Sequence, residues 1–231
     1  MDNRIAIIDR KHLYFNKSKL KLYLLTAFIV FITDSLIFEI NVNTTVIAVK
    51  RYGVIIVAIL MAIYNRNKLK GKISIHLLLL TIFPLISSLL AGYLLNGYYY
   101  YSFIAGIWIG LLYANRYSLS EFAEAFCQIM RVVCIASLVC FIFRDVLVNV
   151  SIFPIIESSK GNSYRWLGVI SIPIKIHQRA RNFGPFWEPG TYQIYTNMAL
   201  LLSLFVLKNN RKAIDALIFT LTGFSTLSGN V

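Results

Sequence analysis

Seven long apolar runs constrain the fold of this 231-residue chain more than any other feature of its sequence. A helix needs roughly 20 apolar residues to cross about 30 Å of hydrocarbon. Hydrophobic residues make up 58% of the chain and charged residues 14%, and the mean hydropathy is +0.66, which is too apolar for one soluble core with a wettable surface. The runs cover residues 22–40, 45–64, 73–95, 99–114, 126–143, 189–207 and 213–231. The sequence therefore predicts an all-α polytopic membrane helix bundle of about seven spans, as one integral membrane domain over residues 1–231.

Membrane topology accounts for the net charge of +13 better than a nucleic-acid partner does. With the N-terminus in the cytoplasm, most of the 23 Lys and Arg residues fall in cytoplasmic segments, which is the bias of the positive-inside rule. We therefore expect membrane lipid, and no nucleic acid, as a partner. Cys127, Cys134 and Cys140 form no Cys-x-x-Cys pair and have no neighbouring His, so neither a disulfide framework nor a metal site is indicated.

The long outer loop of residues 144–188 is where we expect the chemistry. It carries six basic residues, against the positive-inside bias, and is punctuated by Pro154, Pro173 and Pro185. A loop this long with little obvious structure is usually functional or disordered. The alternating residues 166–172, and Ile174 with Ile176, are compatible with short strands.

At its end this loop becomes basic, aromatic and proline-punctuated. Residues 179–193 read Arg-Ala-Arg-Asn-Phe-Gly-Pro-Phe-Trp-Glu-Pro-Gly-Thr-Tyr-Gln and lead into the sixth apolar run. Pro189 suits the first turn of a helix, where its missing N–H would have no partner, so a helix should begin at Glu188 or Pro189. The positive end of that helix would face the segment that carries Arg179 and Arg181, and such a place suits an anion.

A polar stripe continues into the predicted helix. Glu188, Tyr192 and Thr196 are spaced by four, as are Gln193 and Asn197, so these side chains should share a helical face. Lipid cannot satisfy such a stripe, which should therefore face a cavity or another helix. With arginines close by, the predicted cavity is suited to phosphate.

These residues also carry a resemblance to a known family. Arg181-Asn-x-Gly-x-Phe-Trp-Glu-Pro-Gly-x-Tyr-Gln193, followed by Asn197 and an apolar helix, resembles the signature of the Wzy-type polysaccharide repeat-unit polymerases and the related O-antigen ligases. Residues 224–229, Phe-Ser-Thr-Leu-Ser-Gly, look like the Ser/Thr-rich segment that follows in that superfamily. Members usually have more spans and a second basic outer loop, so the chain is expected to be an N-terminal part.

The resemblance implies a glycosyltransferase-C-like enzyme at the outer face of the bacterial inner (plasma) membrane, working without metal, nucleotide sugar or other cofactor. Such an enzyme moves a glycan from undecaprenyl pyrophosphate to a sugar hydroxyl of an incoming lipid-linked repeat unit, in the synthesis of capsule, O-antigen or exopolysaccharide. Its partners would be the undecaprenyl-pyrophosphate-linked glycan and other polysaccharide-assembly proteins.

Roles for individual residues follow from the resemblance and from what this chemistry demands. Because the leaving group is already good, the protein must mainly neutralise the pyrophosphate and position the acceptor hydroxyl, with a base. Arg181 and, secondarily, Arg179 are expected to bind pyrophosphate. Glu188 is either the base or a group that orients the arginines and caps the helix, and His177 is the second candidate base. The side chains expected to contact sugars are Trp187, Tyr192, Gln193, Asn197 and Trp166.

Three other functions remain open at this point. An O-antigen ligase would transfer the glycan to another acceptor, but ligases often carry an Arg after the later Ser, whereas Gly229 and Asn230 follow Ser228 here. A lipid-linked oligosaccharide flippase or transporter would spread its charges through several spans. A non-catalytic membrane subunit is the third alternative.

Overall fold

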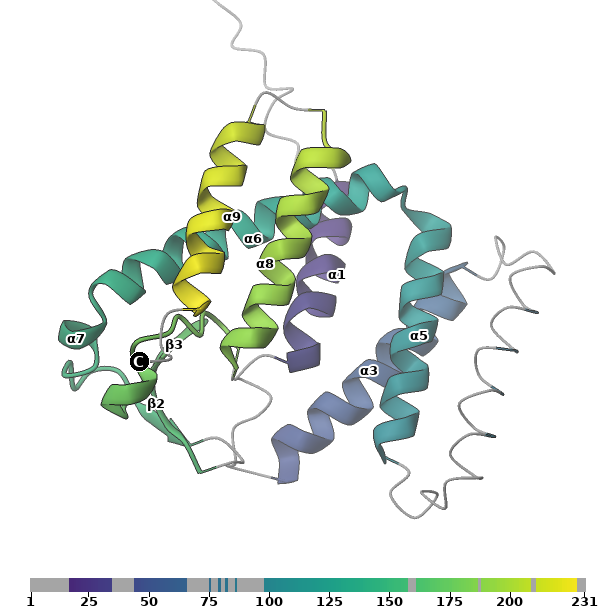
Figure 1. The fold of residues 1–231 in the computed structure, drawn as a ribbon. Helices are drawn as coiled ribbons and strands as arrows, with labels where there is room; N and C mark the ends of the chain where they lie inside the picture. The colour runs from purple at the N-terminus through teal and green to yellow at the C-terminus, as the bar shows by residue number, and fades with distance from the viewer. Residues whose placement is uncertain are drawn as a thin grey trace, which may run out of the picture.

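The computed structural model describes residues 17–34, 44–65, 98–157, 161–186, 188–208 and 211–227, and residues 75, 79, 82 and 86 (Figure 1). The described helices are α1 (Lys17–Asp34), α3 (Thr44–Asn65), α5 (Tyr98–Arg116), α6 (Leu119–Ile142), α7 (Arg144–Leu147), the 3₁₀ helix η3 (Ile176–Gln178), α8 (Pro189–Phe205) and α9 (Lys212–Leu227). The strands are β1 (Ile155–Glu157), β2 (Ser163–Leu167) and β3 (Ile170–Pro173).

Helix α6 lies across the other helices and holds them together. A capping box starts it, in which Ser118 Oγ accepts from the backbone N–H of Glu121, and the Glu121 carboxylate accepts from the N–H of Ser118. The helix packs against α1, α8 and α9 (Figure 1). Alanine and cysteine side chains on its buried surface, such as Ala123 and Cys127, let these neighbours approach closely.

Two apolar clusters fill the helical part of the molecule. One lies between α6, α8 and α9, and the other lies between α1, α3 and α5. A line of aromatic ring contacts joins them, from Tyr113 of α5 through Phe122 and Phe126 of α6 to Tyr195 of α8, which stacks on Phe186 at 4.7 Å between ring centroids. The clusters are therefore in contact through the N-terminal half of α6.

The three strands form a small antiparallel sheet of order β1-β2-β3, beside the N-terminal end of α8 and the C-terminal end of α9 (Figure 1). Leu167 pairs with Ile170 across a tight hairpin, which is possible because Gly168 adopts a φ of 87°. Tyr164 and Phe183 pack together as a separate small core. The strands expected within residues 166–172 are thus confirmed, as parts of β2 and β3. The strand expected at Ile174 to Ile176 is not formed, because β3 ends at Pro173 and Ile176 begins η3.

The predicted fold class, an all-α bundle of seven membrane spans, is wrong. Residues 155–157, 163–167 and 170–173 form the antiparallel sheet, since alternating side chains and Gly168 favour a hairpin with its own core. Among the described helices, α6 alone is long and apolar enough to cross a membrane, a property that buried core helices of other proteins share. Helix α8 has 17 residues, at the short end of the lengths that span a membrane. The expected span at 73–95 falls almost wholly outside the described residues.

Candidate functional site

Asn182, within the sequence motif, attaches the loop to two helices. Its Nδ2 atom donates to Ser137 Oγ of α6 at 3.3 Å and to Ser225 Oγ of α9 at 3.0 Å. Its Oδ1 atom accepts from the backbone N–H of Gly184 at 3.0 Å, and its own N–H donates to the carbonyl of Ser225 at 2.9 Å. Because Asn182 is almost fully buried, these bonds form away from water and fix the position of the loop.

Gly184 and Tyr192 form the second part of this attachment. Gly184 has a φ of 54°, and a Cβ built there would lie 2.5 Å from Tyr192 Cε1, so no other residue fits without a shift. The Tyr192 hydroxyl shares a hydrogen bond of 2.5 Å with Ser137 Oγ, and the side chain is completely buried. Its ring contacts that of the equally buried Phe186. We call Asn182, Gly184, Phe186 and Tyr192 the motif anchor.

The start of α8 is as the sequence predicts. Pro189 is its first residue, and Glu188 is the N-cap with extended backbone angles of −137° and 130°. The Glu188 side chain makes no capping hydrogen bond and is exposed. It lies near Tyr164, whose pKa is raised above its ordinary value mainly by burial; a hydrogen bond with Asn162 lowers this pKa, and the negative charge of Glu188 makes a smaller contribution that raises it.

Arg179 holds the loop together through its own guanidinium. Its Nε and Nη2 atoms donate to the carbonyl of Ile174 at 3.1 and 2.6 Å, and its Nη1 atom lies 3.5 Å from the carboxylate of Asp145. Arg165 acts in the same way, donating to the carbonyls of Val148 and Phe153 at 3.0 and 2.6 Å. Both arginines therefore satisfy backbone carbonyls that the irregular segment leaves unpaired.

The polar stripe expected on α8 is divided by the fold. Tyr192 and Thr196 lie in the core, where Thr196 Oγ1 donates to the carbonyl of Tyr192 at 2.8 Å. Gln193 is half-buried and Asn197 is exposed, with Asn197 Oδ1 facing Gly223 of α9. The buried part of the stripe therefore packs against other helices, and its exposed part lies at the surface beside α9.

The remaining predicted residues lie around the sheet and η3. Arg181 is half-buried next to Asn182, and its N–H donates to the carbonyl of Gln178. His177 is exposed on η3. Trp166 is half-buried in β2, with a buried Nε1 that has no hydrogen-bond partner among the described residues. Trp187 lies outside the described residues.

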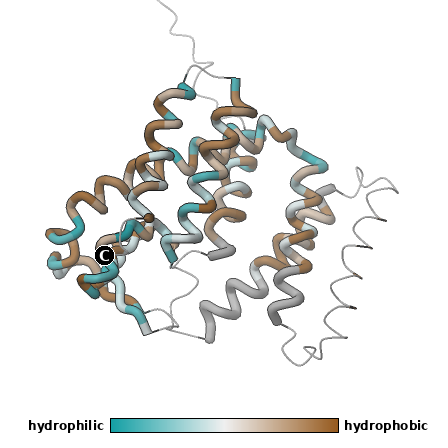
Figure 2. The backbone as a smooth tube through the Cα atoms, viewed as in Figure 1, coloured by the Kyte–Doolittle hydropathy of each residue, from teal (hydrophilic) through white to brown (hydrophobic). Residues whose placement is uncertain are grey.

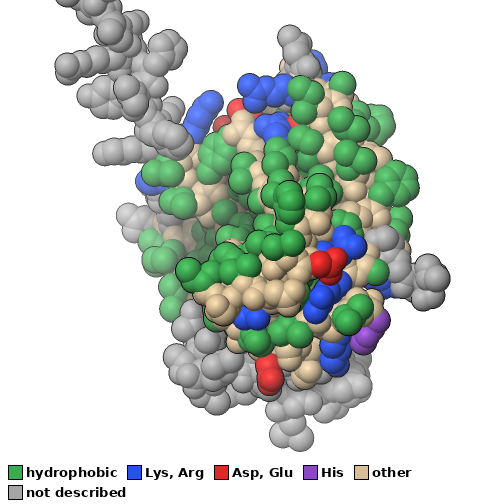
Figure 3. Space-filling view, turned by 90° about the vertical axis from the view of Figure 1, so that its left-hand side faces the viewer, with side chains coloured by type: hydrophobic (Ala, Val, Ile, Leu, Met, Phe, Trp, Pro, Cys, Tyr) green, Lys and Arg blue, Asp and Glu red, His purple; other side chains and the backbone are tan. Residues whose placement is uncertain are grey.

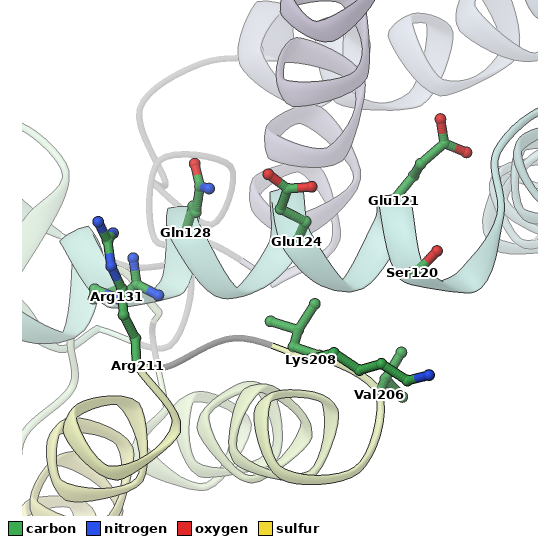
Figure 4. A pocket seen from close by; sticks show the side chains of 9 residues that line it. Ser120, Glu121, Glu124, Gln128, Arg131, Val206, Lys208 and Arg211 are labelled. Atoms are coloured by element: carbon green, nitrogen blue, oxygen red, sulfur yellow. The ribbon is translucent and has the colours of Figure 1, made fainter.

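Sequence reasoning missed a second polar region, at the opposite end of α8. A cavity of about 720 Å³ lies there between α6 and residues 206–208 and 211 (Figure 4). Its lining consists of Ser120, Glu121, Glu124, Gln128, Arg131, Val206, Leu207, Lys208 and Arg211. The four-residue spacing of Glu124 and Gln128 on a helix was the signal available in the sequence.

A buried ion pair forms one wall of this cavity. Arg131 donates from Nε and Nη2 to the two carboxylate oxygens of Asp215, and Ser203 Oγ donates to the same carboxylate at 3.2 Å. Asp215 is completely buried, whereas 18% of the Arg131 side chain is exposed. The pair thus presents a guanidinium to the cavity and keeps its counter-charge in the core.

Comparison with known proteins identifies no relative of this chain. Neither a family model, nor a curated protein, nor a solved structure matches the chain. Within the described part of the chain, no group of three or more His, Cys, Asp or Glu residues is placed to hold a metal ion.

Proposed function

We propose that this protein works at the bacterial inner (plasma) membrane as a glycosyltransferase-like enzyme that joins lipid-linked oligosaccharide repeat units in surface polysaccharide synthesis. One observation carries the proposal. The motif residues that attach the loop to the helices are the amide, the glycine and the aromatic ones of the motif anchor. Arg181 directly precedes the anchor and is half-buried, and Glu188 lies between its Phe186 and Tyr192 and is exposed. The anchor therefore fixes the backbone that carries a cation and a carboxylate.

The distribution of apolar side chains supports a membrane location. Large apolar residues on α8 and α9 point outward, among them Ile194, Phe205, Leu217 and Phe224, each exposed by 61% or more. Figure 2 shows apolar residues along most of the length of these helices, and Figure 3 shows apolar side chains across one face with Lys and Arg above and below them. Apolar surface of this extent is typical of a membrane or protein contact.

In the proposed reaction the acceptor is a sugar hydroxyl of one repeat unit and the donor is a glycan on undecaprenyl pyrophosphate. The hydroxyl oxygen attacks the anomeric carbon of the donor, and the bond from that carbon to the pyrophosphate oxygen breaks. The hydroxyl proton passes to the Glu188 carboxylate, and Arg181 neutralises the charge that develops on the departing pyrophosphate. Arg179 has the supporting role of shaping the loop, because its guanidinium is engaged by Ile174 and Asp145.

Glycan ladders from a host that carries the variant in place of the wild-type protein test the proposal. Arg181→Lys should abolish most polymerisation, since a point charge cannot replace a planar guanidinium on pyrophosphate. The matched control is Arg116→Lys, at another half-buried arginine, at the end of α5 and distant in sequence from the motif. Near-normal ladders from Arg181→Lys, with the variant at wild-type level in the membrane, would end the pyrophosphate assignment.

Glu188→Gln separates the two roles of the carboxylate. A base cannot be replaced by an amide, so ladders should shorten or disappear while the protein level stays constant. Because Glu188 makes no capping hydrogen bond, the same change should leave the thermal stability nearly unaltered. Full activity of Glu188→Gln would exclude it as the base.

A further inference from the structure

The cavity at the far end of α8 has the features of a binding site. We propose that it binds a phosphate group carried by a hydroxylated ligand, with Arg131 and Arg211 on the phosphate and Glu124 on the hydroxyls. This inference does not rest on the proposed function, because it concerns other residues at the opposite end of α8 from Glu188.

Arg131 is already oriented for such a ligand. The Nε and Nη2 atoms of Arg131 donate to the two carboxylate oxygens of Asp215 at 2.6 and 2.9 Å. The Nη1 atom of Arg131 makes no hydrogen bond with any described residue. The buried carboxylate, itself bonded by Ser203, keeps the guanidinium from moving. A cation fixed before binding loses little conformational entropy when an anion arrives. Guanidinium groups also match the geometry of phosphate oxygens.

Arg211 brings a second guanidinium to the same end of the cavity. Figure 4 shows Arg131 of α6 and Arg211, which directly precedes α9, close together there. The backbone carbonyl of Arg211 accepts from the N–H of Asp215 at 2.9 Å, so the position of Arg211 is tied to the ion pair. Two neighbouring cations repel each other, and a phosphate bound between them attracts both, which offsets that repulsion.

Side chains on the other wall of the cavity disfavour a ligand that carries several phosphates and no hydroxyls. Glu124 and Gln128 project from the same side of α6 (Figure 4), and Gln128 Oε1 accepts from the Tyr23 hydroxyl at 2.6 Å. Glu121 is engaged by Ser118 in the capping box, so Glu124 is the carboxylate left to face a ligand. A carboxylate accepts hydroxyl hydrogens and repels a second phosphate. The ligand is therefore a polyol monophosphate or diester, from a lipid headgroup or from a soluble compound.

Binding is tested with the full chain, purified in detergent, by the shift of its thermal unfolding temperature at constant ionic strength. The soluble probes are inorganic phosphate and glycerol 3-phosphate. The lipid arm compares nanodiscs of phosphatidylglycerol mixed with phosphatidylcholine against nanodiscs of phosphatidylcholine alone. Glycerol 3-phosphate or phosphatidylglycerol should raise the unfolding temperature, and the arm that responds identifies the source of the phosphate.

The variants connect the effect to the cavity. Arg211→Ala should weaken the binding of the effective probe by about tenfold or more, the loss expected for one charge-assisted contact. Arg211→Ala leaves the Arg131 and Asp215 pair in place, whereas a change of Arg131 would strand a buried carboxylate. Lys175→Ala, at an exposed cation of the loop, should bind like the wild type.

Glu124→Gln should reduce the preference for glycerol 3-phosphate over inorganic phosphate without weakening inorganic phosphate. Two results overturn the proposal. In the first, no probe raises the unfolding temperature of the wild-type chain. In the second, the effective probe binds Arg211→Ala and Lys175→Ala equally well.

Discussion

Arg131 on α6 donates to both carboxylate oxygens of Asp215 on α9, across 84 residues of sequence. The carboxylate is completely buried, so it has no water to replace its partner. Sequence alone does not indicate this contact, since the two residues lie in separate apolar segments and no motif relates them. The contact nevertheless joins α6 to α9 inside the core.

Removing one member of this pair should be strongly destabilising. Asp215→Ala leaves a guanidinium against the core without its counter-charge, and we expect a loss of about 3–5 kcal/mol in the free energy of unfolding. Thermal or denaturant unfolding in detergent measures it. The control is Asp145→Ala, whose carboxylate is 73% exposed and 3.5 Å from Arg179, and which should change stability by about 0–1 kcal/mol. Equal losses for the two variants would show that the pair is not structurally important.

Glycine at position 184 should be essential to the motif anchor. Gly184→Ala combines a φ of 54° with a Cβ 2.5 Å from the Tyr192 ring, so the loop must shift or Tyr192 must leave its pocket. Gly161→Ala is the matched control, because Gly161 has a φ of 73° but no atom within 4 Å of the added Cβ. Gly161→Ala should cost about 1 kcal/mol, and Gly184→Ala clearly more. Similar unfolding temperatures for the two variants would contradict the contact.

Loss of the Asn182 amide should loosen the loop from the helices. Asn182→Ala removes the bonds to Ser137 and Ser225, with an expected cost of about 1–3 kcal/mol. Limited proteolysis within residues 161–186 should become faster. Asn149→Ala, which removes one exposed bond to the carbonyl of Asp145, should leave the cleavage rate unchanged. An unchanged rate in Asn182→Ala would mean that the loop is held elsewhere.

Tyr164 makes the stability of the sheet depend on pH at the alkaline end. Burial raises the pKa of its hydroxyl above 10, the Glu188 charge raises it further, and a hydrogen bond with Asn162 opposes both. Below pH about 10 the folded and unfolded chains both keep the proton, so this residue adds no pH dependence. As pH rises further the unfolded chain ionises first, and the free energy of unfolding falls until the pKa of the folded state is passed.

The comparison that isolates this effect is wild type against Tyr164→Phe. Tyr164→Phe should show a weaker decline of stability at alkaline pH, and the difference in tyrosinate absorbance should place the ionisation of Tyr164 above the ordinary value. An ordinary pKa for Tyr164 would contradict its burial.

Local signals in the sequence predicted local structure well. Pro189 placed the start of α8 correctly, because proline fixes φ and lacks the N–H that a first turn does not use. The alternation around Gly168 indicated the strands for an equally local reason. The apolar run 126–143 covers only part of helix α6, which begins at Leu119. The capping box at Ser118 starts the helix there, so that residues 119–125 and the apolar run form one continuous helix.

The sequence does not indicate which groups within the fold each helix and side chain contacts. Length and apolarity predicted spans, but the same properties suit a helix whose small side chains pack inside a protein, as Ala123 and Cys127 of α6 do. Arg179 is a secondary candidate for pyrophosphate binding, and the sequence does not indicate that its guanidinium also donates to the carbonyl of Ile174. Whether a cation binds a ligand or a carbonyl depends on the backbone that surrounds it, and no periodicity encodes that.

The separate core of the sheet has a consequence for how this protein can vary. Tyr164 and Phe183 pack with each other in a cluster distinct from the two helical ones, while Asn182 and Gly184 fix where the loop meets the helices. Strands and turns on the far side of that junction can change in length and sequence while the junction itself stays constant. We therefore expect the sheet to tolerate substitutions in β1, β2 and their turn that the junction with the helices does not tolerate.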